Sequence, residues 1–474
     1  MTLHKHILVI GGGPAGVQAA LAASGPGRSV TLVSEGPPGG RAAWQTLLPS
    51  KMWLEAARQE VSARQEFAAR QAADPLELAQ VGGLGMQPPG FDAAPIRALR
   101  ERYERVAGTW QRQILDELER AGVNLRLGTA SFLSPHEIQI MPPEGGYPDQ
   151  IAVDSVIIAS GSVPFVPPGL QPDGQRIFSP HMIWQIPDLP RSMVVIGAGG
   201  PATEYVDAFS RLGVQITWIT GPVGVLSAFP PDAGRFISGL MERRGVKILT
   251  GMLARQIEYT ADGVRVLMAG SATPEAELAF VAIGLRPDLD RLNLPAAGLK
   301  VGSSGGLAVD AVGRTAVPHI YLAGDAASPL SANISLAQGR MVGWHAAGLE
   351  AELPRPELSV MAIYTNPQVA MIGRMSDRDQ ALRKVRVPFR TCLRAHLLGQ
   401  AGTSDEGGFV ELAFLAAPPR KITGALAVCP EAAEIMTTLA VAIRAGMTVD
   451  ELASVPAAHP TFSELAILAA RTAK

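Results

Sequence analysis

Two copies of one pattern, a short apolar segment followed by a glycine-rich turn, constrain the fold of this chain more than any other feature. Residues 7–10 (Ile-Leu-Val-Ile) lead into GGGPAG at 11–16, and residues 193–196 (Met-Val-Val-Ile) lead into GAGGPA at 197–202. Each turn is followed by a helix-forming segment and by a second apolar segment, at 29–34 and at 214–219. This is the sequence context of a βαβ dinucleotide-binding unit. We therefore predict an α/β chain with two such units.

The glycine turns are predicted to bind phosphate. Glycine allows the backbone to come close to a pyrophosphate, and the first N–H groups of the following helix carry a partial positive charge. A single glycine turn can also serve strand-to-helix packing alone, but the flanking strand and helix favour the binding interpretation in both copies. The residues predicted to line the turns are Gly11, Gly13, Pro14, Ala15 and Gly16 in the first, and Gly197, Gly199 and Ala202 in the second.

The composition excludes several classes of protein. Hydrophobic residues make up 47% of the 474 residues and charged residues 18%, which supports several packed cores and argues against disorder. The 41 basic and 43 acidic side chains nearly cancel, so nucleic acid is not an expected partner. Stable membrane insertion is not expected, because no run of 18 uncharged apolar residues occurs. With two cysteines, no secretory signal and no HxxH spacing among eight histidines, we expect a cytoplasmic protein without a metal site.

Helical patterns fill much of the region between the two turns. Apolar residues recur at helical spacing over residues 95–121, and residues 45–73 also favour a helix. Residues 82–90 are rich in glycine and proline and are predicted to form a loop. Pro354 and Pro356 indicate a linker before a separate C-terminal domain.

Seven motifs occur in an order that resembles the pyridine nucleotide-disulfide oxidoreductase family of flavoproteins, which includes dihydrolipoamide dehydrogenase and mercuric reductase. The motifs span nearly the whole chain and lie at residues 11–16, 39–51, 157–162, 197–204, 282–287, 321–325 and 459–464. The resemblance implies two Rossmann-like domains, one for FAD and one for NADH or NADPH, and a C-terminal α+β dimerisation domain. The implied bounds are 1–150 and 286–350 for the FAD domain, 151–285 for the NAD(P) domain and 351–474 for the dimerisation domain.

The resemblance also implies residues that contact the cofactors. Those implied for FAD, besides the first turn, are Gly40, Lys51, Ser160, Gly161, Gly324, Asp325 and Ala337. In the family, the aspartate that matches Asp325 hydrogen-bonds the ribityl chain, a role that suits a carboxylate at a strand end. Lys51 and Glu204 match a catalytic ion pair beside the nicotinamide and the reactive nitrogen of the flavin. Gly284 is implied for NAD(P).

His459 and Glu464 match a catalytic pair that, in the family, reaches the flavin site of the partner subunit. The resemblance therefore implies a homodimer. An imidazole held by a carboxylate is suited to acid–base chemistry near neutral pH. Two roles stay open for His459: proton transfer to an acceptor, or a contribution to the dimer interface alone.

The ribose contacts are marked less clearly than the phosphate contacts. Counting from the first turn places Ser34 where an acidic residue is usual, so the adjacent Glu35 is the candidate ligand for the adenosine ribose of FAD. Thr220 holds the corresponding position in the second unit, and residues 221–231 carry no charge. NADH and NADPH therefore stay equal candidates. Asp232 and Arg235 lie further on, and for them a solvated loop is favoured over a fold back toward the ribose.

One departure from the family decides the predicted function. The two redox cysteines of the family, spaced Cys-x4-Cys before Pro-Ser-Lys, would fall at Ala42 and Leu47. Neither side chain can form a disulfide, and Cys392 and Cys429 lie outside every flavin motif. We therefore predict a diaphorase-like enzyme that passes electrons from NAD(P)H through FAD directly to a small-molecule acceptor, for which a quinone is favoured.

Two alternatives stay open. One is a dihydrolipoamide dehydrogenase-like or transhydrogenase-type enzyme of the same family. The other is a catalytically silent flavin-binding dimer, which is favoured by the missing ribose-reading charge at Thr220.

Overall fold

The computed structural model describes residues 5–73, 93–270, 273–303, 305–328, 331–351, 355–376, 381–400 and 407–473. The predicted loop at 82–90 and Pro354 of the predicted linker lie outside these residues. The chain divides into two compact units. The first comprises Met1–Pro49, Glu101–Phe165 and Gly284–Pro356, and the second comprises Ser50–Arg100, Val166–Ile283 and Glu357–Lys474.

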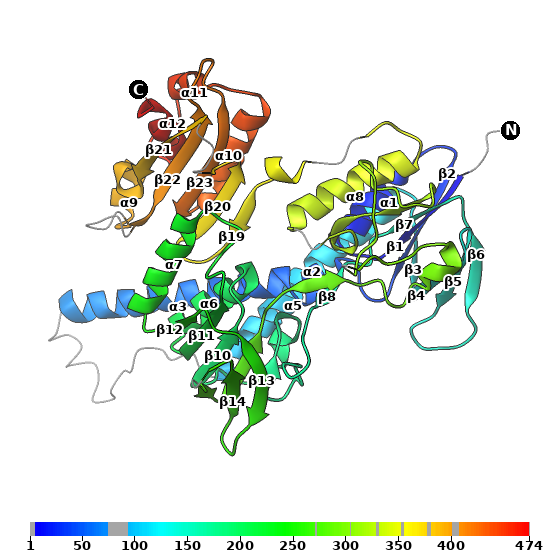
Figure 1. Cartoon of the computed structure of the whole chain (residues 1–474), viewed down its shortest axis with the longest axis horizontal. Helices are drawn as coiled ribbons and strands as arrows, with labels where there is room; N and C mark the ends of the chain where they lie inside the picture. Colours follow the sequence, from blue (N-terminus) through cyan, green and yellow to red (C-terminus); the bar gives the residue numbers. More distant parts are fainter. Residues whose placement is uncertain are drawn as a thin grey trace. The chain divides into compact units, whose positions relative to one another are not determined.

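A five-stranded parallel sheet forms the centre of the first unit (Figure 1). Its order is β18 (Ile320–Leu322), β7 (Ser155–Ile158), β1 (Lys5–Ile10), β2 (Arg28–Ser34) and β3 (Asn124–Leu127). Side chains of β1 alternate between two cores, with Ile7 and Val9 in one and Leu8 and Ile10 in the other. A strand buried on both faces requires a continuous apolar run, which accounts for the tetrapeptide before the first turn.

Helices α1 (Pro14–Ala23) and α8 (Ala332–Ala346) pack closely beside this sheet. A Cβ atom on Gly339 would lie 2.1 Å from the carbonyl oxygen of Ala15, and one on Gly343 would lie 2.4 Å from that of Ala19. Because any side chain at these two positions would collide with the backbone of α1, glycine is required for the approach. The contact places the helix that follows β18 against the helix that follows the first glycine turn.

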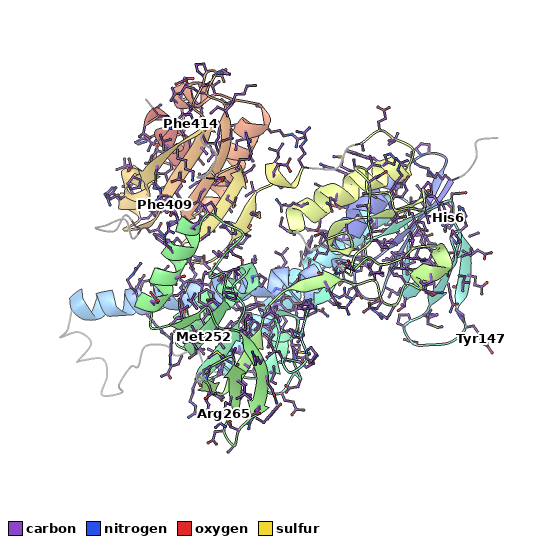
Figure 2. All side chains as sticks on the ribbon, in the orientation of Figure 1. His6, Tyr147, Met252, Arg265, Phe409 and Phe414 are labelled. Atoms are coloured by element: carbon purple, nitrogen blue, oxygen red, sulfur yellow. The ribbon has the colours of Figure 1, made fainter. Side chains whose placement is uncertain are left out.

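An antiparallel sheet packs into the core that contains Leu8. It consists of β4 (Thr129–Ser134), β5 (Glu137–Met141) and β6 (Asp149–Ala152), and it contributes Phe132 and Ile138. Tyr147, between β5 and β6, projects outward and is 96% exposed (Figure 2).

The first unit continues beyond the bound expected from the sequence. β7 begins after residue 150 and pairs in parallel with β1. The chain then forms β8 (Ser162–Pro164), which pairs with β17 (Leu285–Pro287). The first part of the unit therefore extends to Phe165 and includes the motif at 157–162.

The two helices predicted from periodicity are confirmed. Residues expected to be helical at 45–73 form α3 (Leu47–Ala73), preceded by the short α2 (Gly40–Trp44). Residues expected to be helical at 95–121 form α5 (Ala93–Arg120). In the described part of the chain, no helix combines the length and apolar character needed to cross a bilayer.

A second five-stranded parallel sheet lies in the second unit. Its order is β12 (Lys247–Thr250), β11 (Gln215–Gly221), β10 (Ser192–Ile196), β16 (Leu278–Val281) and β9 (Ile177–Phe178). Helix α6 (Gly200–Arg211) follows β10, and α7 (Pro231–Arg243) follows β11. The antiparallel strands β13 (Ala254–Tyr259), β14 (Val264–Met268) and β15 (Glu275–Ala276) complete this domain. The order β10, α6, β11 repeats that of β1, α1, β2.

The C-terminal part of the second unit has an antiparallel sheet and its own core. The strand order is β19 (Met361–Ile363), β20 (Gln368–Gly373), β23 (Ile422–Cys429), β22 (Phe409–Leu415) and β21 (Leu382–Pro388). Phe409 and Phe414 lie on β22 (Figure 2). The accompanying helices are α9 (Leu393–Leu397), α10 (Ala432–Arg444), α11 (Val449–Ser454) and α12 (Glu464–Arg471). The fold class predicted from the sequence, two Rossmann-like domains and an α+β domain, is confirmed.

Candidate active site

The first glycine turn is shaped to bring its backbone close to a ligand. Gly11 has φ +115°, and a Cβ atom there would lie 2.1 Å from the carbonyl oxygen of Ala159. A Cβ atom on Gly16 would lie 1.7 Å from the carbonyl oxygen of Gly11. Gly13, by contrast, has no described atom within 4 Å of such a Cβ, and no described side chain caps the start of α1. The turn therefore leaves open space in front of N–H groups that favour an anion.

Two further predicted segments lie against this turn. A Cβ atom on Gly40 would lie 2.7 Å from Cα of Gly13, so the start of α2 touches the glycine turn. A Cβ atom on Gly324 would lie 2.7 Å from that of Ala15, so the end of β18 reaches the start of α1. The structure thus brings together residues that are more than 300 positions apart, as the carboxyl ends of parallel strands require.

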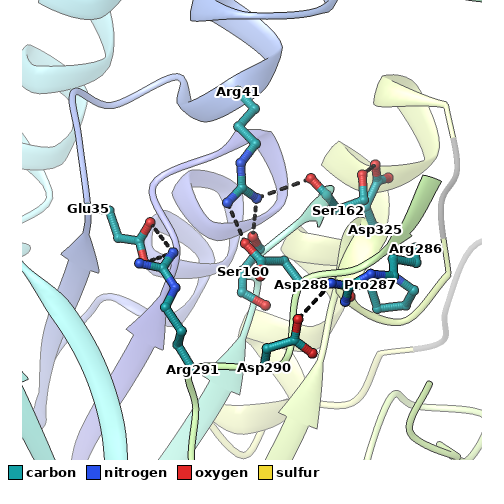
Figure 3. A network of polar contacts seen from close by, with 10 residues as sticks. All are labelled: Glu35, Arg41, Ser160, Ser162, Arg286, Pro287, Asp288, Asp290, Arg291 and Asp325. Atoms are coloured by element: carbon teal, nitrogen blue, oxygen red, sulfur yellow. Dashed lines mark hydrogen bonds and ion pairs between the residues drawn. The ribbon is translucent and has the colours of Figure 1, made fainter. Parts of the chain in front are cut away.

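Asp325 follows Gly324 and is oriented by the hydroxyl groups of Ser162 and Ser335; Figure 3 shows Asp325 beside Ser162. Ser162 Oγ donates to one carboxylate oxygen at 2.7 Å, and Ser335 Oγ donates to the other at 3.3 Å. Ser160 lies two positions before Ser162, and its Oγ is buried without a hydrogen-bond partner among the described residues. Acceptors and an unpaired hydroxyl at the sheet edge fit the hydroxyl-rich ribityl chain of FAD. Ala337 lies on α8 and is partly buried.

Glu35 lies directly after β2 and forms an ion pair with Arg291 at 2.7 Å. Both side chains are about half exposed, at 46% and 56%. Ser34 is buried, and its hydroxyl donates to the carbonyl oxygen of Gly36. The hydroxyl of Ser34, the residue at the usual ribose-binding position, is therefore used in a hydrogen bond within its own turn. The carboxylate of Glu35 lies at the surface.

The second glycine turn repeats the geometry of the first. Gly197 has φ +121°, and a Cβ atom there would lie 2.1 Å from the carbonyl oxygen of Ala282. Gly199 has no described atom within 4 Å of a Cβ, and no described side chain caps α6. The buried hydroxyl of Thr220 has no partner among the described residues. Ala202 is buried on α6. These features fit a second dinucleotide. Gly284, which the sequence suggested for NAD(P), begins the last segment of the first unit rather than lying in the second unit with this turn.

The expectation that Asp232 and Arg235 lie in a solvated loop is wrong. Both residues lie on the first turns of α7 and pair with each other, and Asp232 also forms an ion pair with Arg386 on β21. The hydrogen bond from Arg386 holds the pKa of Asp232 below its ordinary value. Pro231 at the first helical position is a signal that could have predicted this helix.

Lys51 and Glu204 form the ion pair whose members the sequence suggested. Nζ of Lys51 lies 2.9 Å from both carboxylate oxygens of Glu204. Lys51, near the start of α3, is 30% exposed, and Glu204 on α6 is 5% exposed. A buried carboxylate keeps its charge only with strong donors, which here are the ammonium group and a backbone N–H.

That backbone N–H belongs to Tyr364, a residue that sequence reasoning missed. Its N–H donates to Glu204 at 3.0 Å, and its ring lies 4.7 Å from Nζ of Lys51. Burial and the charge of Glu204 raise the pKa of the Tyr364 hydroxyl. No local pattern marks Tyr364, because it meets Glu204 across 160 positions.

His459 and Glu464 form a second acid–base pair. Nδ1 of His459 lies 2.8 Å from Glu464, which starts α12 and is buried, whereas the imidazole is 62% exposed. The other oxygen of Glu464 accepts a 3.5 Å hydrogen bond from the thiol of Cys392, which also contacts the carbonyl oxygen of Thr461 at 3.2 Å. Burial raises the pKa of Cys392, so the thiol is a proton donor at neutral pH. No pattern in the sequence indicated that Cys392 joins this pair.

The chain's two cysteines are free and buried in the C-terminal core. Ala42 lies on α2, and Leu47 begins α3. Neither position therefore holds a thiol that could form a redox disulfide.

Comparisons with known proteins agree with the fold and the motifs. Residues 5–351 match the family described as pyridine nucleotide-disulphide oxidoreductase, and residues 359–470 match the dimerisation domain of that family. The NAD(P)H dehydrogenase (quinone) of Mycobacterium tuberculosis is 30% identical, over 98% of this chain and 93% of its own length. The dihydrolipoyl dehydrogenase of Bacillus subtilis is 29% identical, over 97% and 96%. The crystal structure of LpdA from Mycobacterium tuberculosis has a TM-score of 0.87 at 28% identity, covering 99% of each chain.

Proposed function

Because the chain belongs to the pyridine nucleotide-disulphide oxidoreductase family, we propose that it is an FAD-dependent enzyme that oxidises NADH or NADPH and reduces a quinone directly. One observation carries the proposal: both glycine turns have the open backbone geometry that suits a dinucleotide, while Ala42 and Leu47 occupy the positions where the family has its two redox cysteines. Electrons must then leave the flavin without a disulfide step. The name of the mycobacterial relative supports a quinone as the acceptor.

The chain's own residues would bind and orient the cofactors. FAD, when bound, would supply the two-electron chemistry that links hydride donor and quinone. The N–H groups at the start of α1 would hold its pyrophosphate, and Asp325 would accept hydrogen bonds from its ribityl hydroxyls. Lys51, aligned by Glu204, would supply a fixed positive charge where negative charge builds up during reduction.

His459 would supply a proton. Reduction of a quinone to a quinol takes two electrons and two protons, and NAD(P)H delivers two electrons and one proton as a hydride. The second proton must come from an acid. The imidazole of His459, exposed on one side and held at Nδ1 by Glu464, is suited to deliver it from Nε2. By the resemblance, this imidazole would serve the flavin of the partner subunit in a homodimer.

We further propose that NADH and NADPH are used with similar efficiency. Thr220 is neutral, and residues 221–231 carry no charge. Asp232 and Arg235 pair with each other at the start of α7, and Asp232 also pairs with Arg386. We expect the two kcat/KM values to agree within about tenfold, since residues 220–231 offer neither a carboxylate for a ribose hydroxyl nor a guanidinium for a 2′-phosphate.

The test is oxidation of NADH and NADPH by the purified protein with menadione or with lipoamide as acceptor. We expect menadione turnover and negligible lipoamide turnover. Fast lipoamide turnover without menadione turnover would support the dihydrolipoamide dehydrogenase alternative. Anaerobic titration separates the silent alternative, because flavin that stays oxidised with both nucleotides would show a binding protein rather than a reductase.

A further inference from the structure

Arg41 lies on α2, one position before Ala42, and contacts two other segments of the first unit (Figure 3). Its Nη1 donates to the carbonyl oxygens of Ser160 and Ser162, each at 3.1 Å. Its Nη2 forms an ion pair with Asp288. The two side chains are 29% and 13% exposed, so solvent screens the pair less than it screens a surface ion pair.

Asp288 holds the same turn from its backbone. Its N–H donates to the carbonyl oxygen of Gly161 at 2.9 Å, while its carboxylate takes the guanidinium of Arg41. Gly161 has φ +78°, and a Cβ atom there would lie 3.6 Å from Nη1 of Arg41. The three carbonyl groups of residues 160–162 are therefore all bound by the Arg41–Asp288 pair.

Both ends of this arrangement reach the proposed FAD site. At one end, Gly40 adjoins Arg41 and touches the first glycine turn at Gly13. At the other end, Ser162, whose carbonyl oxygen binds Arg41, donates its hydroxyl to Asp325 at 2.7 Å. One guanidinium thus links the phosphate-binding turn with the carboxylate proposed for the ribityl chain.

We propose that Arg41 and Asp288 are a positioning pair that sets the FAD site by fixing α2 to the turn at residues 160–162. Hydrogen bonds and an ion pair thus fix the segment that carries Ala42, the residue at the position of a redox cysteine in the family. Arginine suits the role because its planar fork can serve two carbonyl oxygens and a carboxylate together, whereas a lysine ammonium on a flexible stem orients such a set poorly. The inference rests on the proposed FAD-binding function.

The test compares Arg41→Met, Arg41→Lys, Asp288→Asn and the Arg41→Met/Asp288→Asn double variant. The dissociation constant of FAD is measured by titrating the apoprotein, and the thermal midpoint of the apoprotein and the KM for NADH are measured beside it. We expect Arg41→Met to weaken FAD binding on the order of tenfold and Arg41→Lys to restore little of it. The double variant should bind FAD no worse than Arg41→Met, and KM for NADH should stay unchanged.

Asp290→Asn is the matched control. It breaks the exposed 2.7 Å ion pair between Arg286 and Asp290, which lies in the same segment as Asp288, and it should leave FAD binding unchanged. Asp288→Asn is nearly isosteric and keeps the carbonyl contacts of Arg41, so it tests the pair if Arg41→Met does not fold. An unchanged FAD dissociation constant in the folded variants, with or without a lower thermal midpoint, would overturn the positioning role. A wild-type protein that binds no FAD would instead overturn the proposed function.

Discussion

Glu204 places a carboxylate inside the second unit with 5% of its side chain exposed. Its charge is compensated by Lys51 and by the backbone N–H of Tyr364. Breaking a buried pair on one side is costly because the remaining charge is left without its partner, whereas removing both charges can be nearly neutral. The partial exposure of Lys51 moderates this cost.

We expect Lys51→Met to destabilise the apoprotein by about 1–3 kcal/mol, because Glu204 keeps only its backbone donor. The Lys51→Met/Glu204→Gln double variant should recover part of that loss and still reduce its flavin slowly with NADH. Urea unfolding and anaerobic stopped-flow absorbance measure the two effects. A double variant that loses the sum of the single losses would show that the two charges are not coupled.

Cys392 extends the His459–Glu464 pair to a chain of three groups. Its raised pKa keeps the thiol protonated, so the thiol donates to Glu464 and stabilises the carboxylate. Without that donor, the carboxylate shares its negative charge with one donor fewer, so its hydrogen bond with Nδ1 of His459 should strengthen. We expect Cys392→Ala to change the NMR chemical shift of Nδ1 of His459, measured at one fixed pH and assigned with His459→Ala.

Cys429→Ala is the control for this measurement, because Cys429 is buried in the same core but Cys392 is the cysteine that donates to Glu464. It should leave the chemical shift of His459 Nδ1 unchanged. The raised thiol pKa also predicts a sign for stability: the contribution of Cys392 is fully present below the pKa of the unfolded thiol and is lost as pH rises through the folded pKa. The same His459 Nδ1 chemical shift in both alanine variants would exclude the thiol from the chain of three groups.

At the scale of elements, the sequence predicts those helices, strands and turns that depend on residues close together in the chain. The apolar tetrapeptides, the glycine turns and the two long helices are each specified within one segment, so β1, α1, α3 and α5 follow from the sequence. Which sheet a strand joins depends on distant partners. The first unit therefore extends past residue 150, because β7 pairs with β1. For the same reason, no pattern in the sequence predicts that Tyr364 and Cys392 contact Glu204 and Glu464.

The two glycine types in the first turn should respond differently to substitution. Gly11→Ala is expected to destabilise the apoprotein, because φ is +115° and the new Cβ would lie 2.1 Å from a backbone oxygen. Gly13→Ala should leave the apoprotein stable, since Gly13 has φ −76° and open space, but weaken FAD binding. Thermal unfolding and FAD titration distinguish these effects.

Gly199→Ala is the counterpart of Gly13→Ala in the second turn, where Gly199 also has φ −76° and open space. It should raise KM for NADH and NADPH while FAD binding stays unchanged. If Gly13→Ala and Gly199→Ala had the same effect on both cofactors, the assignment of one turn to each dinucleotide would be wrong.

At the scale of the whole molecule, the match to the family's dimerisation domain supports a homodimer, in which an exposed imidazole can meet a second subunit. His459 is 62% exposed, although Glu464 and Cys392 fix it from the buried side. An imidazole that is oriented by buried groups and exposed to solvent on its other side is suited to act on a group bound by the partner subunit. In a homodimer with twofold symmetry, each subunit would supply its imidazole to the other and receive one in return.

Mixing two inactive variants tests this exchange. His459→Ala lacks the proton donor, and Asp325→Ala lacks the proposed flavin contact, so each homodimer should reduce menadione slowly. Refolded together, half of the dimers would be mixed, and each mixed dimer would hold one site with both native residues. We expect about a quarter of wild-type activity from the mixture, measured after sedimentation analysis has confirmed the dimer. If His459 acted within its own chain, every site in the mixture would lack one residue, and activity would stay at the level of the separate variants.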